Sequence, residues 1–308
     1  MKIFKYLLII SLTIFSQTIK SQESYAPEDV VDEKFGIIKY ESLNIMLGKD
    51  SIRNDARGYA ANGYIEDFYK DGQLLHKGFY VDGQLKVYKN YFPNGKVERN
   101  FRMTDIKKSK MTIYYSDGKI KSKGDYRADK RIGKWIYYYE NGNIEQEGIF
   151  KRGVPDGLWK WYFESGKLKR EEFYRMGYEE GESFEYDEEG LLIASGSYIE
   201  GLKEGEWKYN FYFHTESGNY KNDYKHGLWR YYYENGKLYF EGNFVQGLFD
   251  GKHLYYHKNG KLKEVQHYVL GMKEKNWEFY DYYGTLIKIL TFENDKLTKI
   301  DGISVEID

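Results

Sequence analysis

The 308-residue chain contains no cysteine and only three prolines. Without cysteine it cannot form a disulfide, a thiolate metal site, a cysteine nucleophile or a cysteine-mediated linkage to a partner. It also lacks a net charge of either sign, because 47 Lys and Arg residues offset 48 Asp and Glu residues to leave −1. No overall positive charge is available to hold a polyanion, so we expect no nucleic-acid ligand.

Aromatic residues and glycine are abundant. Aromatics make up 19% of the chain, with 34 Tyr, and there are 32 Gly. This composition favours strands and tight turns over helices. Hydrophobic residues, at 41%, are sufficient for a packed core. We therefore expect an all-β protein.

One apolar run, from Tyr6 to Phe15, follows Lys2 and Lys5 and precedes polar residues that end at Gln22. A membrane-spanning helix needs about 20 apolar residues, and this run is shorter. The pattern is typical of a secretory signal peptide over residues 1–22, with an uncleaved anchor as the less favoured alternative. We expect an exported protein that is periplasmic, attached to the cell surface or extracellular.

A repeat of 23 or 24 residues determines the predicted fold. Its marker is a turn-like pair that ends in glycine, at Asp71-Gly72, Asn94-Gly95, Asp117-Gly118, Asn141-Gly142, Ser165-Gly166, Glu189-Gly190, Asn235-Gly236, Asn259-Gly260 and Tyr283-Gly284. One larger gap contains a unit that has lost two residues near His214. About ten units thus occupy residues 63–292, between an N-terminal cap at 23–62 and one C-terminal capping strand at 293–308.

Each unit predicts a β-hairpin, and residues 133–150 are a clear example. Asn141-Gly142 is the strongest short hairpin signal, and we expect a two-residue turn in which both residues have positive φ. Counting outward from that turn places Trp135 opposite Gly148. We expect the indole to cover the backbone of its cross-strand glycine. Successive hairpins predict an elongated single-sheet solenoid in which each unit touches only its neighbours.

Strand alternation divides the aromatic residues between two faces. The Trp face carries Trp135 and its equivalents and is the predicted packed face. The Tyr face carries a column at Tyr91, Tyr114, Tyr138, Tyr162, Tyr186, Tyr232, Tyr256 and Tyr280. Tyrosine and basic residues are enriched at interface hot spots, so the candidate partner-binding residues are Tyr138, Tyr162, Lys160, Tyr232, Arg230 and Tyr256. The alternative is that the column is a second buried layer.

The repeat pattern, nearly complete in residues 124–144 and 218–238, resembles the MORN-repeat variant of bacterial YwqK-type antitoxin components from toxin–antitoxin systems. The resemblance implies non-catalytic β-hairpin modules that contact protein or lipid. An antitoxin role implies a protein that binds and neutralises a partner toxin. The matching positions are those that build the hairpins, so the resemblance implies no particular site residues.

No catalytic or metal constellation is recognisable. His253 and His257 lie about 13 Å apart in a strand, too far to chelate one ion, and we interpret them as strand-surface histidines. Acidic pairs such as Glu171-Glu172 are interpreted as solvated charges, and Ser183 as a replacement for the usual Trp. We expect no enzyme activity, no cofactor and no metal.

Two binding hypotheses follow from these features. The first is a scaffold for a protein partner, either a toxin or an envelope protein, which binds through the Tyr face. The second is recognition of an envelope glycan or lipid headgroup, in which recurring aromatic rings stack on sugars or enclose a quaternary amine.

Overall fold

The computed structural model describes residues 30–31, 53–54, 57–69, 71–128 and 130–305. This part of the chain is built from strands and turns, and no helix in it is long and apolar enough to cross a membrane. The predicted all-β hairpin-repeat class is confirmed. The predicted signal peptide lies outside the described residues, as does most of the predicted N-terminal cap.

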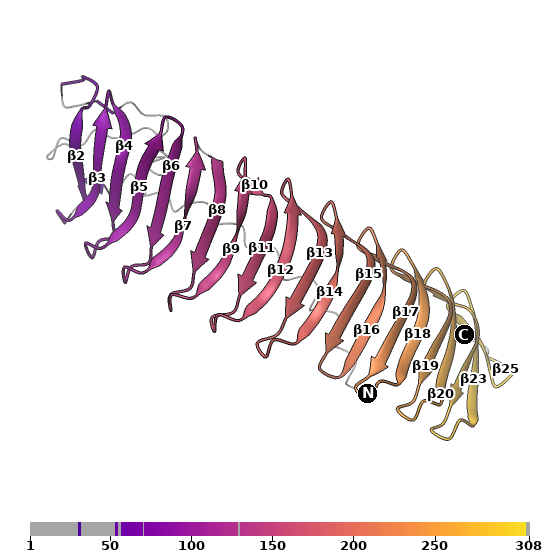
Figure 1. The fold of residues 1–308 in the computed structure, drawn as a ribbon. Helices are drawn as coiled ribbons and strands as arrows, with labels where there is room; N and C mark the ends of the chain where they lie inside the picture. The colour runs from indigo at the N-terminus through magenta and orange to yellow at the C-terminus, as the bar shows by residue number, and fades with distance from the viewer. Residues whose placement is uncertain (1–29, 32–52, 55–56, 70, 129, 306–308) are drawn as a thin grey trace. The chain divides into compact units, whose positions relative to one another are not determined.

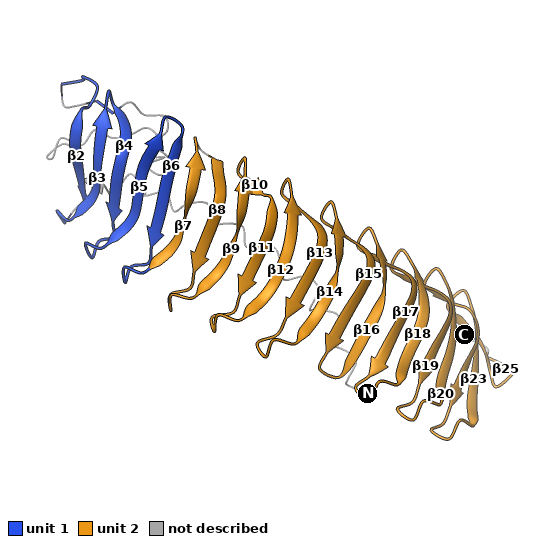
Figure 2. Ribbon diagram, in the orientation of Figure 1, with its two compact units in different colours: residues 1–119 blue, residues 120–308 orange. Residues whose placement is uncertain are grey.

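The chain divides into two compact units, residues 1–119 and 120–308, which Figure 2 colours separately. In the first unit each strand from β2 to β5 pairs antiparallel with the strand that follows it, and β1 pairs with β2. The strands are β1 (Val30–Val31), β2 (Gly63–Tyr69), β3 (Leu74–Val81), β4 (Gln84–Tyr91), β5 (Val97–Asp105) and β6 (Lys108–Tyr114).

The second unit is an antiparallel meander in which successive hairpins lie side by side (Figure 1). Its first strands are β7 (Ile120–Arg127), β8 (Lys130–Tyr138), β9 (Ile144–Lys151), β10 (Val154–Pro155), β11 (Gly157–Tyr162), β12 (Leu168–Arg175), β13 (Tyr178–Tyr186) and β14 (Leu192–Ile199). There follow β15 (Leu202–Phe211), β16 (His214–Lys221), β17 (Tyr224–Tyr233), β18 (Leu238–Val245), β19 (Leu248–Tyr256) and β20 (Leu262–Val269).

The last strands are β21 (Met272–Lys273), β22 (Lys275–Tyr280), β23 (Leu286–Glu293), β24 (Lys296–Ile300) and β25 (Ile303–Ser304). The predicted repeat region, residues 63–292, corresponds to β2 to β23. Beyond it, β24 pairs with β25 as a short hairpin, where the sequence predicted one capping strand.

The Asn-Gly hairpin tips differ from the predicted two-residue turns. At one tip the Tyr139 amide donates to the Asn143 carbonyl at 2.9 Å, and the Gly142 amide donates to the Tyr139 carbonyl at 2.9 Å. Gly142 has φ +94°, whereas the φ of Asn141 is not positive. The loop is therefore a three-residue turn that ends in a left-handed glycine. Asn141 acts through its side chain, which accepts a hydrogen bond from the Asn143 amide at 2.9 Å.

The predicted register of the tryptophans is nevertheless correct. A β-bulge shifts the register between Tyr137 and Tyr138, and this shift compensates for the longer loop. Trp135 therefore pairs with Gly148 as expected. The corresponding pair in the unit at 227–244 also has the predicted register.

The indoles pack over a different glycine from the one expected. A Cβ atom built on Gly148 would lie 2.1 Å from Trp159 of the following hairpin, and one on Gly218 would lie 2.3 Å from Trp229. The indoles of Trp135, Trp159, Trp207 and Trp229 thus cover a glycine of the preceding hairpin, whereas the sequence predicted cover of the cross-strand partner. At Trp277 the corresponding position holds Gln266. This packing links adjacent hairpins, because an indole in one hairpin occupies the space that its neighbour leaves open.

The Trp face is the core, as predicted. Exposure is 1% for Trp135, 4% for Trp159, 3% for Trp207, 0% for Trp229 and 7% for Trp277. Each of these indole nitrogens donates to a backbone carbonyl ten residues earlier, at 2.9 to 3.1 Å. A buried indole N–H needs a hydrogen-bond acceptor, and here a carbonyl of the strand beneath the ring provides it.

Two interpretations from the sequence are wrong on this face. His253, which we interpreted as a strand-surface residue, is fully buried at a tryptophan position and lies over Gly242. Glu172, which we interpreted as solvated, is only 3% exposed. It occupies the glycine position of the repeat, and Ser183 occupies the position of the indole that covers this glycine in other hairpins.

Candidate functional site

The four candidate tyrosines occupy one equivalent position in four hairpins. Tyr138 ends β8, Tyr162 ends β11, and Tyr232 and Tyr256 lie near or at the ends of β17 and β19. All four are half-buried. The Tyr column is thus neither a fully exposed ladder nor a second buried layer.

Two of the candidate phenols are held by glutamates. Tyr162 donates to Glu147 Oε1 at 3.2 Å, and Tyr256 donates to Glu241 Oε1 at 3.2 Å. In each case the glutamate lies 15 residues earlier. Partial burial and the adjacent Glu147 charge raise the pKa of Tyr162 to about 12, and burial with the Glu241 charge raises the pKa of Tyr256.

The two candidate basic residues form ion pairs with facing strands. Lys160 Nζ lies 3.1 Å from Glu171 Oε2, and Arg230 Nε lies 3.4 Å from Glu241 Oε2. Glu241 therefore connects Arg230 with Tyr256, which places three side chains of neighbouring strands in one bonded group.

The other two candidate tyrosines have different surroundings. The Lys123 ammonium lies 5.4 Å from the centroid of the Tyr138 ring, within the range of a cation–π interaction. Tyr232 pairs with Thr215 on one side and with Leu238 on the other. The candidate set thus forms separate local groups along the Tyr face.

The glutamates of this face are functional candidates that the sequence analysis did not select, and Glu171 was interpreted there as a solvated charge. Glu147, Glu171 and Glu241 occupy the same repeat position, immediately before the strand glycine or, at Glu171, before the residue that replaces it. The correct register places Lys160 opposite Glu171 and Arg230 opposite Glu241, so cross-strand pairing was a usable signal.

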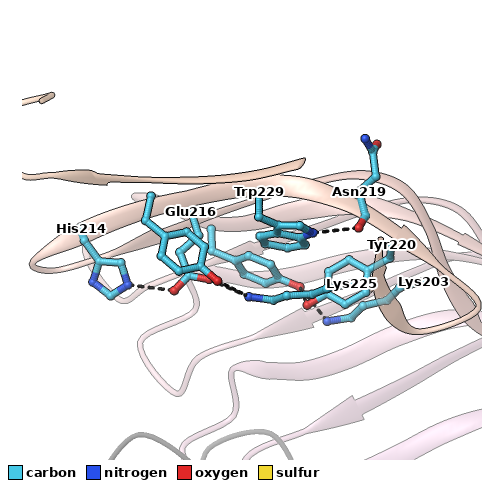
Figure 3. Close-up of polar contacts among 9 residues, drawn as sticks. Lys203, His214, Glu216, Asn219, Tyr220, Lys225 and Trp229 are labelled. Atoms are coloured by element: carbon cyan, nitrogen blue, oxygen red, sulfur yellow. Dashed lines mark hydrogen bonds and ion pairs between the residues drawn. The ribbon is translucent and has the colours of Figure 1, made fainter. Parts of the chain in front are cut away.

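The Trp face carries a second polar network, shown in Figure 3. Lys225 Nζ lies 3.9 Å from the Trp229 ring centroid, donates to the Tyr231 hydroxyl at 2.8 Å, and approaches Glu216 at 3.2 Å. Glu216 also lies 3.0 Å from His214 Nε2. Burial is the main cause that lowers the pKa of Lys225, and the Glu216 carboxylate opposes it.

The same arrangement recurs in other hairpins, with a cation four residues before the tryptophan. Lys203 lies 4.3 Å from the Trp207 centroid and donates to the Tyr209 hydroxyl at 2.8 Å, and burial lowers its pKa. Arg131 covers Trp135 and Lys273 covers Trp277, each at 5.0 Å. These indoles are therefore capped by the chain's own cations.

No group of three or more potential metal ligands is found in the part of the chain that the structure describes. In particular, His253 lies in the core, and His257 Nε2 lies 3.1 Å from the Tyr280 carbonyl oxygen. The two histidines that the sequence analysis considered thus make separate contacts, one in the core and one with a backbone carbonyl.

Five segments of the chain match a protein-family model described as the MORN repeat variant. They are residues 109–128, 131–152, 155–176, 225–246 and 249–269. MORN repeats are generally scaffolds that bind proteins or membranes, and they are not typically enzymatic. No curated protein is significantly similar to the chain.

Proposed function

We propose that the chain is a non-catalytic, exported repeat scaffold that binds a protein partner. The observation that carries the proposal is the bonded group Arg230, Glu241 and Tyr256 on the partly exposed Tyr face. Tyr and Arg are enriched at interface hot spots, and side chains that are already held in place lose less conformational entropy when a partner binds.

The non-catalytic part of the proposal is supported by how the titratable core groups are bonded. Glu172, Lys203 and Lys225 have shifted pKa values, which is a common property of active-site groups. Each of them is bonded to side chains of the packed Trp face. Burial in a structural network accounts for these shifts without a reaction.

A protein partner is favoured over a glycan by the state of the indoles. Stacking on sugar rings needs an accessible aromatic face, and Trp229 is fully buried beneath Lys225. The Tyr face offers half-buried rings flanked by ion pairs, which is the mixed character of a protein interface.

Export and the antitoxin role belong to the same proposal. The basic residues and apolar run of residues 1–22 support export. The resemblance to YwqK-type antitoxin components supports a toxin as one class of partner, and export supports an envelope protein as the other.

Affinity capture from the native host tests the proposal. The full chain, tagged at its C-terminus, is recovered from the envelope fraction beside a variant with Tyr138, Tyr162, Tyr232 and Tyr256 changed to Ser. We expect one protein to be enriched with the natural chain and depleted by at least tenfold with the variant. The control changes Tyr212, Tyr282 and Tyr283 to Ser, which are exposed at hairpin tips.

Thermal melts establish that the quadruple variant is folded before its binding is interpreted. If the column is mainly structural, that variant melts at a much lower temperature and captures nothing. Recovery of a glycan or lipid with no enriched protein would contradict the proposed partner class.

A further inference from the structure

Three exposed cations lie together on the Tyr face of the first unit, on the adjacent strands β4, β5 and β6. They are Lys89, Arg102 and Lys110, called here the basic face. Strand pairing places Arg102 directly opposite Lys110, and it places Lys89 opposite Asn100, which precedes Arg102 by two residues on the same face. Side chains that face each other on adjacent strands have Cβ atoms about 5 Å apart, so the three charges form one cluster.

The basic face has no acidic partner. In the part of the chain that the structure describes, none of its three cations takes part in an ion pair. Nearby carboxylates of the first unit already face other cations, because Glu66 lies 2.6 Å from Lys77 and Asp105 pairs with Lys108 across the strands. The positive charge of the basic face is therefore not neutralised by its own hairpins.

Folding alone does not explain this arrangement. Like charges directly opposite each other destabilise a sheet, yet Arg102 faces Lys110. On the Tyr face of the second unit, cross-strand positions pair a cation with a glutamate, as in Lys160 with Glu171. A bound anion would offset the repulsion between the cations of the basic face, so the cluster is suited to binding negative charge.

The sequence contains one strongly charged segment of each sign. Residues 84–119, which include the basic face, contain nine Lys and Arg against three Asp and Glu. Residues 176–202 contain eight Asp and Glu and no Lys or Arg. The near-zero net charge of the chain thus conceals two segments of opposite charge, one in each unit.

The acidic segment forms the hairpin of β13 and β14. Three of its carboxylates are exposed and are called here the acidic set: Glu182, Glu188 and Glu189. Glu182 lies on the Tyr face opposite Ser197, and the other two lie at the hairpin tip. Lys167 donates to the backbone carbonyl of Glu188 at 2.7 Å, but in the described residues no hydrogen bond or ion pair reaches the three carboxylates themselves.

A second copy of the chain is the occupant that these charges select. The basic face and the acidic set are both exposed, and each carries three charges without a partner of opposite sign. Binding between two copies pairs both sets, whereas a polyanion of another class would leave the acidic set unpaired. Charge complementarity of this kind directs association and fixes its register, and salt screens it.

We propose that the basic face of one chain binds the acidic set of a second copy. The two surfaces differ, so the contact is either reciprocal in a closed dimer or repeated in a larger assembly. This inference goes beyond the proposed scaffold function, because it requires no other protein. Its failure would leave that function intact.

Sedimentation velocity of the protein purified from its native host tests the association. We expect species larger than the monomer at low salt, in an amount that rises with protein concentration. They should dissociate in about 1 M NaCl, where the Debye length falls to about 3 Å. A protein that stays monomeric at low salt would overturn the proposal, and so would an association that salt does not weaken.

Charge reversal identifies the two surfaces. One variant reverses the basic face and the other reverses the acidic set, and each alone should associate at least tenfold more weakly than the natural chain. An equimolar mixture should associate again, because each variant keeps the natural surface that the other has lost. A mixture that stays monomeric would contradict the pairing of these surfaces. The substitutions are K89E, R102E and K110E in the first variant, and E182K, E188K and E189K in the second.

A third variant controls for net charge. Lys221, Lys252 and Lys299 are exposed lysines of the second unit, and changing them to Glu alters the net charge as much as reversal of the basic face does. We expect this variant to associate like the natural chain. An equal loss would show that net charge alone is responsible and would overturn the proposal. Thermal melts establish that every variant is folded.

Zero-length crosslinking locates the contact in the natural protein and so depends on no variant. Protein labelled with heavy nitrogen is mixed with unlabelled protein, and a carbodiimide joins amines to carboxylates that touch. We expect crosslinks of mixed isotope between Lys89 or Lys110 and the peptide that holds the acidic set. Crosslinks confined to one isotope would place the contact within a single chain and overturn the proposal. A monomer that carries an anionic lipid or glycan on its basic face would overturn it as well.

Discussion

Ser183 donates a hydrogen bond to the buried Glu172 carboxylate at 3.3 Å, in a place where other repeats put an indole over a glycine. Trp159 over Gly148 is the neighbouring example. Tyr174 also donates to Glu172 at 3.0 Å. One repeat thus replaces both members of the indole–glycine pair with two side chains that are hydrogen-bonded to each other. At the last pair only the glycine is replaced, by the buried Gln266 at the position that corresponds to Trp277.

Substitutions at Ser183 and Glu172 should be strongly coupled in their effects on the free energy of unfolding. Ser183→Trp alone forces an indole against Glu172, and we expect a loss of about 1–3 kcal/mol in the free energy of unfolding. Adding Glu172→Gly should restore at least the natural stability, with an interaction free energy of about 0.5–3 kcal/mol. Urea unfolding of both single variants and the double variant measures this. Additive effects would show that the two positions are independent.

Glu172 should also make stability depend on pH. Burial is the main cause that raises its pKa above the ordinary 4.5, and Arg170, Tyr174 and Ser183 only partly offset it. The native state therefore holds the proton more tightly than the unfolded chain, so stability falls as pH rises from below 4.5 through the raised value. The difference between the natural chain and Glu172→Gln isolates this contribution. Urea midpoints measured from pH 3 to 8 test it, and a difference that does not vary with pH would contradict it.

Removal of an indole should weaken the sheet locally. We expect Trp229→Ala to cost about 3–5 kcal/mol, because the ring is fully buried over Gly218. Hydrogen exchange should accelerate mainly in β15 to β18, since each repeat contacts only its neighbours. Tyr212→Ala, at a 92% exposed tip, is the control and should change stability by no more than about 0.5 kcal/mol. Uniform acceleration along the chain would argue against nearest-neighbour coupling.

The second unit should unfold in alkali. Burial is the main cause that raises the pKa of Tyr137 and of Tyr268 to about 12. The unfolded chain releases these protons near the ordinary pKa of 10, so stability falls progressively above pH 10. We expect tyrosinate absorbance and loss of the β circular dichroism signal to change together between pH 10 and 12. Complete tyrosine ionisation with the sheet intact would contradict this account.

Local patterns in the sequence were sufficient for the fold class, the hairpin register and the core face. Gly-containing turns at a constant interval specify hairpins, and the two-residue period of a strand assigns Trp135 and its equivalents to one side. The register of Trp135 and Gly148 was predicted correctly although the turn type was wrong, because an unpredicted bulge compensates for the longer loop. Bulges depend on both strands of a pair and leave little trace in either strand alone.

Contacts between neighbouring hairpins required the tertiary structure. Pairing within one hairpin is local in sequence, whereas the choice of Gly218 as the surface beneath Trp229 depends on side-chain direction between hairpins. For the same reason Glu172 appeared solvated in the sequence, since its burial depends on side chains that surround it from its own and the neighbouring strand, such as Tyr174 and Ser183. The sequence by itself determined the repeated hairpins and the two faces, and the packing of one hairpin on the next decided which glycine each indole covers and which carboxylate is buried. The physical reason is that strand alternation follows from the backbone, whereas occupancy of space between hairpins depends on the volumes of several side chains together.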